Sequence, residues 1–163
     1  MAIEVREYTE KDEARLLEMA TGLIDLMASM DPHKRFRPKE TFDAKKYLES
    51  RLKKVLEEHG KVLIALTDGK VIGYLMATIK QSTGVDALNK FPAKQGTIDA
   101  LFVDDAYRGR GASTELIESI EQYFKEQDCD YSSVSCIAAN EDARHFYMKK
   151  GYGEQYIDFL KKL

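Results

Sequence analysis

The sequence of 163 residues has few of the features that mark specialised classes of protein. It contains no tryptophan, three prolines and two cysteines, Cys129 and Cys136, whose spacing matches neither a zinc site nor a redox pair. We therefore expect no metal and two free thiols, with Cys136 buried in a strand. No apolar run approaches the roughly 18 residues that a membrane span requires, and no repeat or low-complexity segment interrupts the chain.

The charge balance also disfavours several partners. The net charge of −3 is the wrong sign for a broad nucleic-acid-binding surface, so we expect no nucleic acid partner. The apolar fraction of 44% and charged fraction of 33% are ordinary for a globular protein, and the length fits one domain over residues 1–163. The N-terminus, MAIEVREYTEKDEAR, has no signal-peptide core, which makes a cytoplasmic protein without a membrane partner the default expectation.

Apolar periodicity predicts an α/β domain. A short alternating strand at the N-terminus precedes a helical pattern, which Thr9 and Asp12 open in a near capping-box arrangement. A second helix ends at Gly60. Asp68 and Gly69 then supply the positive φ angles that a tight hairpin between two strands requires.

The second half of the chain continues the alternation of strands and helices. A polar loop at 81–96 leads to a strand at 97–103 and then to a helix with one apolar face. The stretch YSSVSCIAA, residues 131–139, predicts a buried strand, and Asn140 caps a short helix that Gly151 ends. The last residues predict a weaker extended strand, so the expected order is β-α-α-β-β-β-α-β-α-β.

The stretch VDDAYRGRGAS, residues 103–113, joins a strand to a helix through two arginines and two glycines. A helix N-terminus presents unpaired N–H groups and a partial positive charge, and glycines let an anion approach the backbone. Arg108 and Arg110 add positive charge, so the stretch suits a pyrophosphate. A Walker loop would need a lysine and a dinucleotide fingerprint a third glycine, and both are missing here. Taken alone, the stretch also fits a plain turn with exposed arginines.

Two motifs resemble the GCN5-related N-acetyltransferase (GNAT) family. LFVDDAYRGRGAS resembles its motif A, [RQ]-x-x-G-x-[GA], with Arg108 and Gly111 in place and Ser113 where the family has Gly or Ala. NEDARHFYMKKGY resembles N-x-x-A-x-x-x-Y-x-x-x-G-[FY], and the matching positions are Asn140, Ala143, Tyr147, Gly151 and Tyr152. The resemblance implies an α/β single-domain fold with a mixed, mostly antiparallel sheet. That sheet is splayed between its fourth and fifth strands and flanked by helices on both faces.

The resemblance also implies an acyltransferase that moves an acetyl group from acetyl-CoA to a primary amine by direct attack in a ternary complex. The pantetheine arm would pair with the backbone of Leu101 and Val103, with Phe102 between them, and one strand amide would polarise the thioester carbonyl. Asn140 and Ala143 would lie near the pantetheine or the sulfur. The pyrophosphate would be held by backbone N–H groups of the Arg-Gly turn after Arg108, at Gly109, Arg110, Gly111, Ala112 and Ser113.

The reaction needs an acid for the leaving thiolate and a route for the proton of the amine. The resemblance makes Tyr147 the acid, whereas the sequence alone favours a core aromatic beside Phe146. Asp99 is the candidate base, because simple alternation puts it on the same face as Leu101 and Val103, where apolar neighbours would favour proton uptake. The alternatives are an ordered water chain, or an Asp99 that is ion-paired to a lysine or faces solvent because a bulge shifts the strand.

The acceptor stays open. A cluster of positive charge in DPHKRFRPK, at His33, Lys34, Arg35, Arg37 and Lys39, is a candidate for attracting a carboxylate or phosphate on the acceptor, or a solvated loop. A non-catalytic sensor that binds acyl-CoA is the alternative function. An RNA-contacting module built on RGRG is disfavoured by net charge, and the resemblance leaves a homodimer open.

Overall fold

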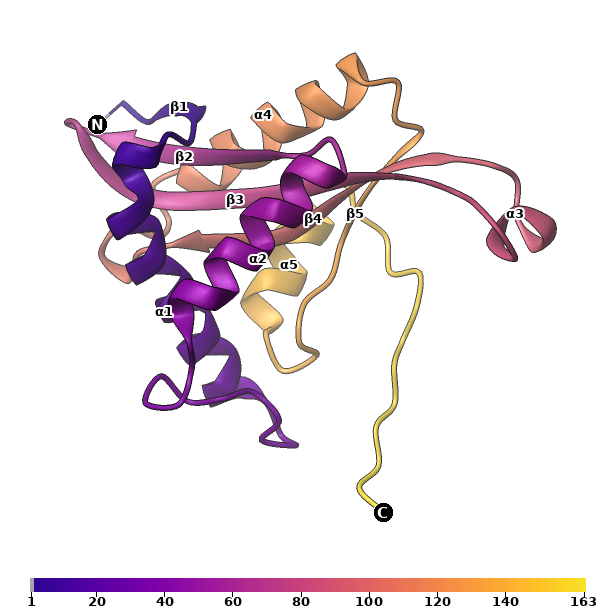
Figure 1. The fold of residues 1–163 in the computed structure, drawn as a ribbon, viewed down its shortest axis with the longest axis horizontal. Helices are drawn as coiled ribbons and strands as arrows, with labels where there is room; N and C mark the ends of the chain where they lie inside the picture. The colour runs from indigo at the N-terminus through magenta and orange to yellow at the C-terminus, as the bar shows by residue number, and fades with distance from the viewer. Residues whose placement is uncertain (1) are drawn as a thin grey trace.

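The computed structural model describes residues 2–163, which form one five-stranded sheet with the order β1-β2-β3-β4-β5. Neighbouring strands are antiparallel except for β4 and β5, which are parallel. Figure 1 shows the strands of the sheet side by side, with a β3–β4 hairpin that projects from the body. The strands are β1 Glu4–Glu7, β2 Lys61–Thr67, β3 Lys70–Gln81, β4 Lys94–Val103 and β5 Tyr131–Val134.

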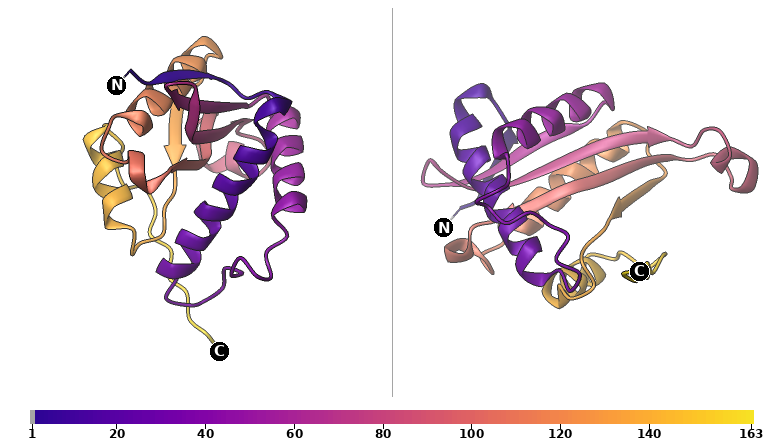
Figure 2. Two further views of the ribbon diagram at one scale, coloured as in Figure 1. Left: turned by 90° about the vertical axis from the view of Figure 1, so that its left-hand side faces the viewer. Right: turned by 60° about the horizontal axis from the view of Figure 1, so that its bottom comes forward.

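Helices cover both faces of the sheet. Helices α1 (Glu13–Met30) and α2 (Ala44–Glu57) lie on one face, and α4 (Ala112–Glu126) and α5 (Glu141–Lys149) lie on the other (Figure 2). The four-residue α3 (Asp86–Asn89) sits at the tip of the β3–β4 hairpin (Figure 1). These layers confirm the predicted fold class, a mixed and mostly antiparallel sheet between helices.

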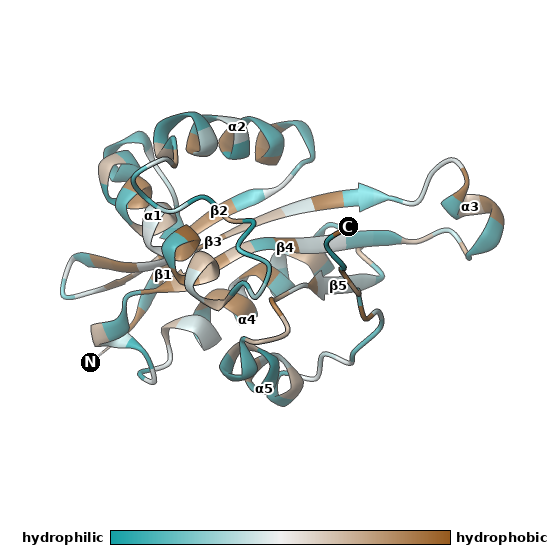
Figure 3. Ribbon diagram, turned by 90° about the horizontal axis from the view of Figure 1, so that it is seen from below, coloured by the Kyte–Doolittle hydropathy of each residue, from teal (hydrophilic) through white to brown (hydrophobic). Residues whose placement is uncertain are grey.

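Each face of the sheet has its own apolar core. On the α4 face, residues of α4 pack on Leu75, Ile98 and Val103, whereas on the other face residues of α1 and α2 pack on Tyr74 and Ala100. Both sets of helices therefore turn an apolar stripe inward, which Figure 3 shows as brown bands along ribbons that are otherwise teal. The inward residues are Leu116, Ile117, Ile120 and Phe124 on α4, and Leu16, Met19, Ala20, Leu48 and Val55 on α1 and α2.

The predicted local signals are present. The Asp12 carboxylate accepts a hydrogen bond from the Thr9 N–H at 2.9 Å at the start of a 3₁₀ turn (Glu10–Asp12), and two from the Arg6 guanidinium at 2.8 and 2.9 Å. These bonds hold the pKa of that carboxyl well below its usual range. Asp68 and Gly69 turn the β2–β3 hairpin with φ angles of 49° and 75°.

The C-terminal part of the chain differs from the prediction. The buried strand expected at 131–139 ends at Val134, and Cys136 is exposed in the loop that follows. Residues 152–163 form no helix or strand, and the exposed fractions of Ile157 and Phe159 are 72% and 92%. Because this segment does not pair with β5 as a last strand, β5 stays at the edge of the sheet. The residues beyond Val134 therefore have no neighbouring strand to bury them.

Candidate active site

Strands β4 and β5 separate half-way along β4. Strand β5 pairs with β4 only from Gln95 to Ile98, opposite Tyr131 to Val134. From Ala100 to Val103, β4 pairs with β3 alone. The predicted splay between the fourth and fifth strands is therefore present, and it leaves one edge of β4 free to pair with an extended ligand.

The backbone of β4 directs its free groups toward this gap. The Asp104 N–H donates to the Ile72 carbonyl at 2.9 Å, so it points toward β3. Since N–H directions alternate along a strand, the N–H groups of Leu101 and Val103 point away from β3 and into the gap. The Phe102 carbonyl instead points toward β3, because its oxygen lies 2.8 Å from where a Cβ on Gly73 would lie.

The turn after β4 has the geometry of an anion site. Gly109 and Gly111 have φ angles of 73° and 96°, and a Cβ on either would find no atom within 4 Å. The first hydrogen bond of α4 runs from the Glu115 N–H to the Gly111 carbonyl. The N–H groups of Ala112 and Ser113 precede that bond and stand at the positive end of the helix dipole. An open, positive turn of this kind fits a diphosphate.

The two arginines of the turn hold different positions. Arg108 Nε donates to the Val103 carbonyl at 3.2 Å, and its guanidinium pairs with Asp105 at 2.8 Å. The Arg110 guanidinium lies over the Tyr107 ring, 5.5 Å from its centroid. Arg108 thus reaches back to the end of the gap, beside the backbone groups that face it.

Tyr147 lies on the α4 face of the sheet, and its ring makes edge contacts with Phe146 and Tyr152 at 5.5 and 5.9 Å between centroids. Burial, with a smaller contribution from the nearby Cys136 thiol, raises the pKa of Tyr147 to about 12. The hydroxyl makes no hydrogen bond with any of residues 2–163. Tyr147 is therefore a protonated donor at neutral pH whose hydrogen has no partner in the described chain.

Asn140 caps α5, as predicted. Its side-chain oxygen accepts a hydrogen bond from the Ala143 N–H at 3.1 Å. This bond uses the Ala143 amide, and it fixes the start of the helix that carries Tyr147. A direct contact of Asn140 or Ala143 with a ligand stays a prediction.

Asp99 lies on the opposite face from the one predicted. The β3–β4 register shifts between Met76 and Ala77, which pair with Ala100 and Ile98, so Asp99 is the extra residue of a β-bulge. The bulge turns its side chain toward α2, while Leu101 and Val103 face α4. Simple alternation failed here because one inserted residue reverses the phase of a strand.

The surroundings of Asp99 are polar, whereas the prediction placed it among apolar side chains. Lys54 Nζ donates to one carboxylate oxygen at 2.7 Å, and the Thr78 hydroxyl donates to the other at 2.7 Å. The Arg51 guanidinium lies 3.7 Å from the first oxygen. The alternative of an ion-paired aspartate is therefore the arrangement in the structure.

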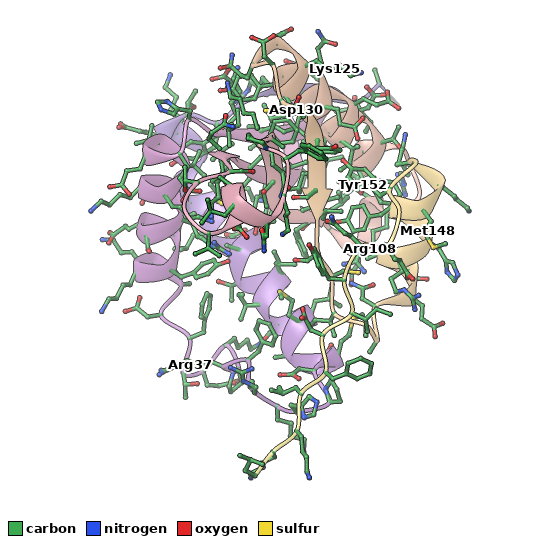
Figure 4. The ribbon with its side chains drawn as sticks, turned by 90° about the vertical axis from the view of Figure 1, so that its right-hand side faces the viewer. Arg37, Arg108, Lys125, Asp130, Met148 and Tyr152 are labelled. Atoms are coloured by element: carbon green, nitrogen blue, oxygen red, sulfur yellow. The ribbon has the colours of Figure 1, made fainter. Side chains whose placement is uncertain are left out.

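The predicted basic loop lies between α1 and α2. The Asp31 carboxylate accepts hydrogen bonds from the N–H groups of His33 at 2.9 Å and Arg35 at 2.6 Å, which orders the loop around it. Figure 4 shows Arg37 of this loop well apart from Arg108 at the turn. The cationic residues of the loop are exposed, and none of them pairs with Asp99.

Comparison with known proteins decides the family. Residues 24–152 match the sequence profile of the Acetyltransferase (GNAT) family, a range that includes the gap, the glycine turn and Tyr147. The chain belongs to the GNAT acetyltransferase family. This assignment confirms the family predicted from the two motifs.

Individual relatives are more distant. MJ1530, an uncharacterized N-acetyltransferase of Methanocaldococcus jannaschii, is 29% identical over 95 residues, which are 58% of this GNAT chain and 53% of that protein. The match thus spans about half the length of that relative. A mutant of the BH1408 protein from Bacillus halodurans aligns over 98% of this chain and 99% of its own, with a TM-score of 0.84 and 22% identity.

A third similar structure is AAC(6')-Iy in complex with a bisubstrate analog, CoA-S-monomethyl-acetylneamine. It aligns over 100% of this GNAT chain and 99% of its own, with a TM-score of 0.69 and 19% identity. At these identities the similarity of the solved structures concerns the fold alone. It supports the layered architecture and the splayed sheet described above.

Sequence reasoning missed the contribution of α2 to this GNAT site. Tyr47, Arg51, Lys54 and Glu58 recur at spacings of four, three and four residues, which places them on one helix face. That periodicity was visible in the sequence. Nothing in it indicated that this face meets Asp99, because the contact depends on the bulge in β4.

Two further findings bear on the class of site. Among residues 2–163, no group of three or more His, Cys, Asp or Glu side chains is arranged to hold a metal ion. None of the helices in this range is long and apolar enough to cross a bilayer.

Proposed function

We propose that this protein is an acetyl-CoA-dependent N-acetyltransferase that acts on a primary amine by direct attack in a ternary complex. The observation that carries the proposal is the order of features along β4 and beyond. The free edge from Asp99 to Val103 leads directly to a turn with two positive-φ glycines at the start of α4. An extended arm that ends in a diphosphate matches this order.

The donor substrate would lie along this edge. The diphosphate would accept hydrogen bonds from backbone N–H groups of the turn and the first turn of α4, from Gly109 to Ser113, with Arg108 and Arg110 beside it. The pantetheine amides would pair with the backbone of Leu101 and Val103. The Leu101 N–H, which points into the gap, would then stabilise the negative charge that develops on the thioester oxygen.

Tyr147 would protonate the leaving thiolate. The amine nitrogen attacks the acetyl carbon, the C–S bond breaks, and the sulfur takes the phenolic proton. The raised pKa of about 12 keeps this proton on Tyr147 throughout the neutral range. The phenolate is restored from solvent through the open end of the gap.

The amine loses its proton to Asp99 or to water. Both Asp99 oxygens already accept hydrogen bonds, from Lys54 and from Thr78. For Asp99 to take the proton, an incoming amine would have to displace Lys54 from it. We therefore propose Asp99 as a base that acts only after Lys54 moves, with an ordered water as the alternative route.

A thiol-release assay with acetyl-CoA and a panel of primary amines tests the proposed function. Release that depends on both substrates, with acetylated amine found by mass spectrometry, is the expected result, and Asp99→Asn lowers the rate without changing CoA affinity. Calorimetric binding of CoA without amine-dependent release across the panel would instead support the non-catalytic sensor. Absence of CoA binding would overturn both.

A further inference from the structure

Helix α2 and its C-cap residue Glu58 present a row of polar side chains to the sheet, here called the α2 polar row: Tyr47, Arg51, Lys54 and Glu58. Arg51 Nε donates to the Tyr47 hydroxyl at 3.2 Å, and the Tyr47 ring is held edge-on against Phe42 at 5.2 Å. Lys54 bonds to Asp99 and lies 3.8 Å from Glu58. The row is therefore tied together and held in place against β4.

The α2 polar row meets β4 at the residue where the gap begins. Asp99 is the bulge residue and the first residue of β4 beyond its pairing with β5. Its carboxylate is mostly buried, with 11% of the side chain exposed, whereas Arg51 and Lys54 each expose 30%. An amine that approaches the gap from the α1–α2 face passes these two cations.

Positive charge is in excess where the α2 polar row meets Asp99. Lys54 neutralises Asp99 at 2.7 Å, and Glu58 lies between Lys54 and Lys80, 3.7 Å from the latter. Arg51 forms a longer ion pair with the same Asp99 oxygen, at 3.7 Å, which is beyond hydrogen-bond length, so three cations face two carboxylates. Its terminal nitrogens make no hydrogen bond with any of residues 2–163.

A half-buried guanidinium with its Nε fixed and both terminal groups available is suited to a carboxylate, which it can bind through two parallel hydrogen bonds. A polyamine would need a second free carboxylate in the same place. Asp99, the one carboxylate at the gap, is bonded to Lys54 and Thr78 and in the proposed reaction would serve the attacking amine alone. Resting on the proposed function, we propose that the acceptor is an amine that also carries a carboxylate, and that Arg51 binds this carboxylate. Arg51 is thereby the residue that selects the acceptor.

Three amines of similar length test this selection: 4-aminobutyrate, 4-aminobutanamide and 1,4-diaminobutane. We expect kcat/KM to fall in that order, with roughly a ten- to hundredfold preference for the acid over the diamine. Arg51→Gln abolishes the preference by raising KM for 4-aminobutyrate alone, and Arg51→Lys retains part of it. In all variants KM for acetyl-CoA stays unchanged.

Lys53→Gln is the matched control, because Lys53 is on the same helix with 76% of its side chain exposed. If the preference for 4-aminobutyrate depends on the positive charge of Arg51, Lys53→Gln leaves it unchanged. An equal loss of the preference in Lys53→Gln and Arg51→Gln would overturn the assignment. A wild-type preference for 1,4-diaminobutane would also overturn it.

Binding separates a failure of this inference from a failure of the proposed function. If no acetyl transfer is detected, calorimetry in the presence of CoA can still measure the affinities of 4-aminobutyrate and 1,4-diaminobutane for wild type and for Arg51→Gln. Tighter binding of the acid that depends on Arg51 supports the inference even if the protein is a sensor. Equal binding of the two amines refutes it whether or not acetyl transfer occurs.

Discussion

The two sides of the gap in the sheet are built by different means. On the α4 side, the site consists of backbone groups, two positive-φ glycines and the buried phenol of Tyr147. On the α2 side, it consists of long charged side chains that bind one another, with Arg51 and Lys54 around Asp99.

If the proposed function holds, the difference reflects how the two halves of a two-substrate site are specified. A diphosphate has constant geometry, and a fixed turn of backbone can recognise it. An acceptor differs from one enzyme to the next, and side chains on a helix can change without altering the strand beneath them. We therefore expect substitutions on the α4 side to affect the common chemistry, and substitutions on the α2 side to affect acceptor choice or local stability.

The largest expected effect is on the α4 side, at Tyr147. Tyr147→Phe removes the phenolic proton and should lower turnover roughly a hundredfold or more, because general acids contribute about 10²- to 10⁴-fold. CoA affinity should stay within error, since the ring is retained. Steady-state thiol release and calorimetry measure the two quantities.

Tyr131→Phe is the control for that change, because Tyr131 lies on the edge strand with 64% exposure. The pKa of about 12 adds a second readout. The acid form persists below that pH, so titration of Tyr147 should cause no fall in rate between about pH 8 and 10. Turnover that survives in Tyr147→Phe would mean that solvent protonates the thiolate.

The next effect concerns the side covered by α1 and α2, which relies on ion pairs. Asp12→Asn breaks the paired hydrogen bonds to Arg6 at the start of α1 and should lower the free energy of unfolding by about 1–2 kcal/mol at pH 7. The folded pKa of Asp12 lies below its usual value, so its contribution is present above about pH 4 and is lost as the pH falls. Urea unfolding in steps from pH 7 down to about pH 2 measures both.

The difference in stability between wild type and Asp12→Asn should therefore narrow progressively as the pH falls below about 4. Asp86→Asn, on the exposed α3, is the control and should change little at any of these pH values. A difference that does not narrow at all between pH 4 and pH 2 would show that Asp12 contributes through packing and not through its charge.

The smallest expected effect is on the glycine turn. Gly111→Ala places a side chain at a φ of 96° in the open turn and should weaken CoA binding roughly three- to tenfold. Gly69→Ala is a matched control, because Gly69 has a φ of 75° and equally open surroundings at a hairpin turn. Both variants should lose a similar free energy of unfolding, about 1 kcal/mol. Equal CoA affinity in the two would argue against a diphosphate at the turn.

The sequence predicted the features that depend on local chemistry. The capping of α5 by Asn140, the hairpin at Asp68 and Gly69, and the turn at Gly109 and Gly111 all follow from backbone preferences that a few neighbouring residues determine. The splay between β4 and β5 came from the family resemblance and not from the residues themselves.

The features that the sequence did not predict depend on distant contacts. The face on which Asp99 lies follows from a bulge against β3, and its partners Arg51 and Lys54 come from α2. The end of β5 at Val134 depends on whether residues 152–163 pair with it, which apolar content alone does not determine.

Because Asp99 is the extra residue of a β-bulge, it does not take part in the alternation of side chains between the two faces of the sheet. Ile98 faces α4 and Ala100 faces α2, as adjacent residues of an uninterrupted strand would if Asp99 were deleted. Removing Asp99 would thus leave every apolar side chain of β4 on its present face of the sheet. Only the ion pairs of Arg51 and Lys54 with the Asp99 carboxylate would be lost. Natural variation in the length of this strand would therefore change the chemistry of the acceptor side while leaving the packing of the sheet as it is.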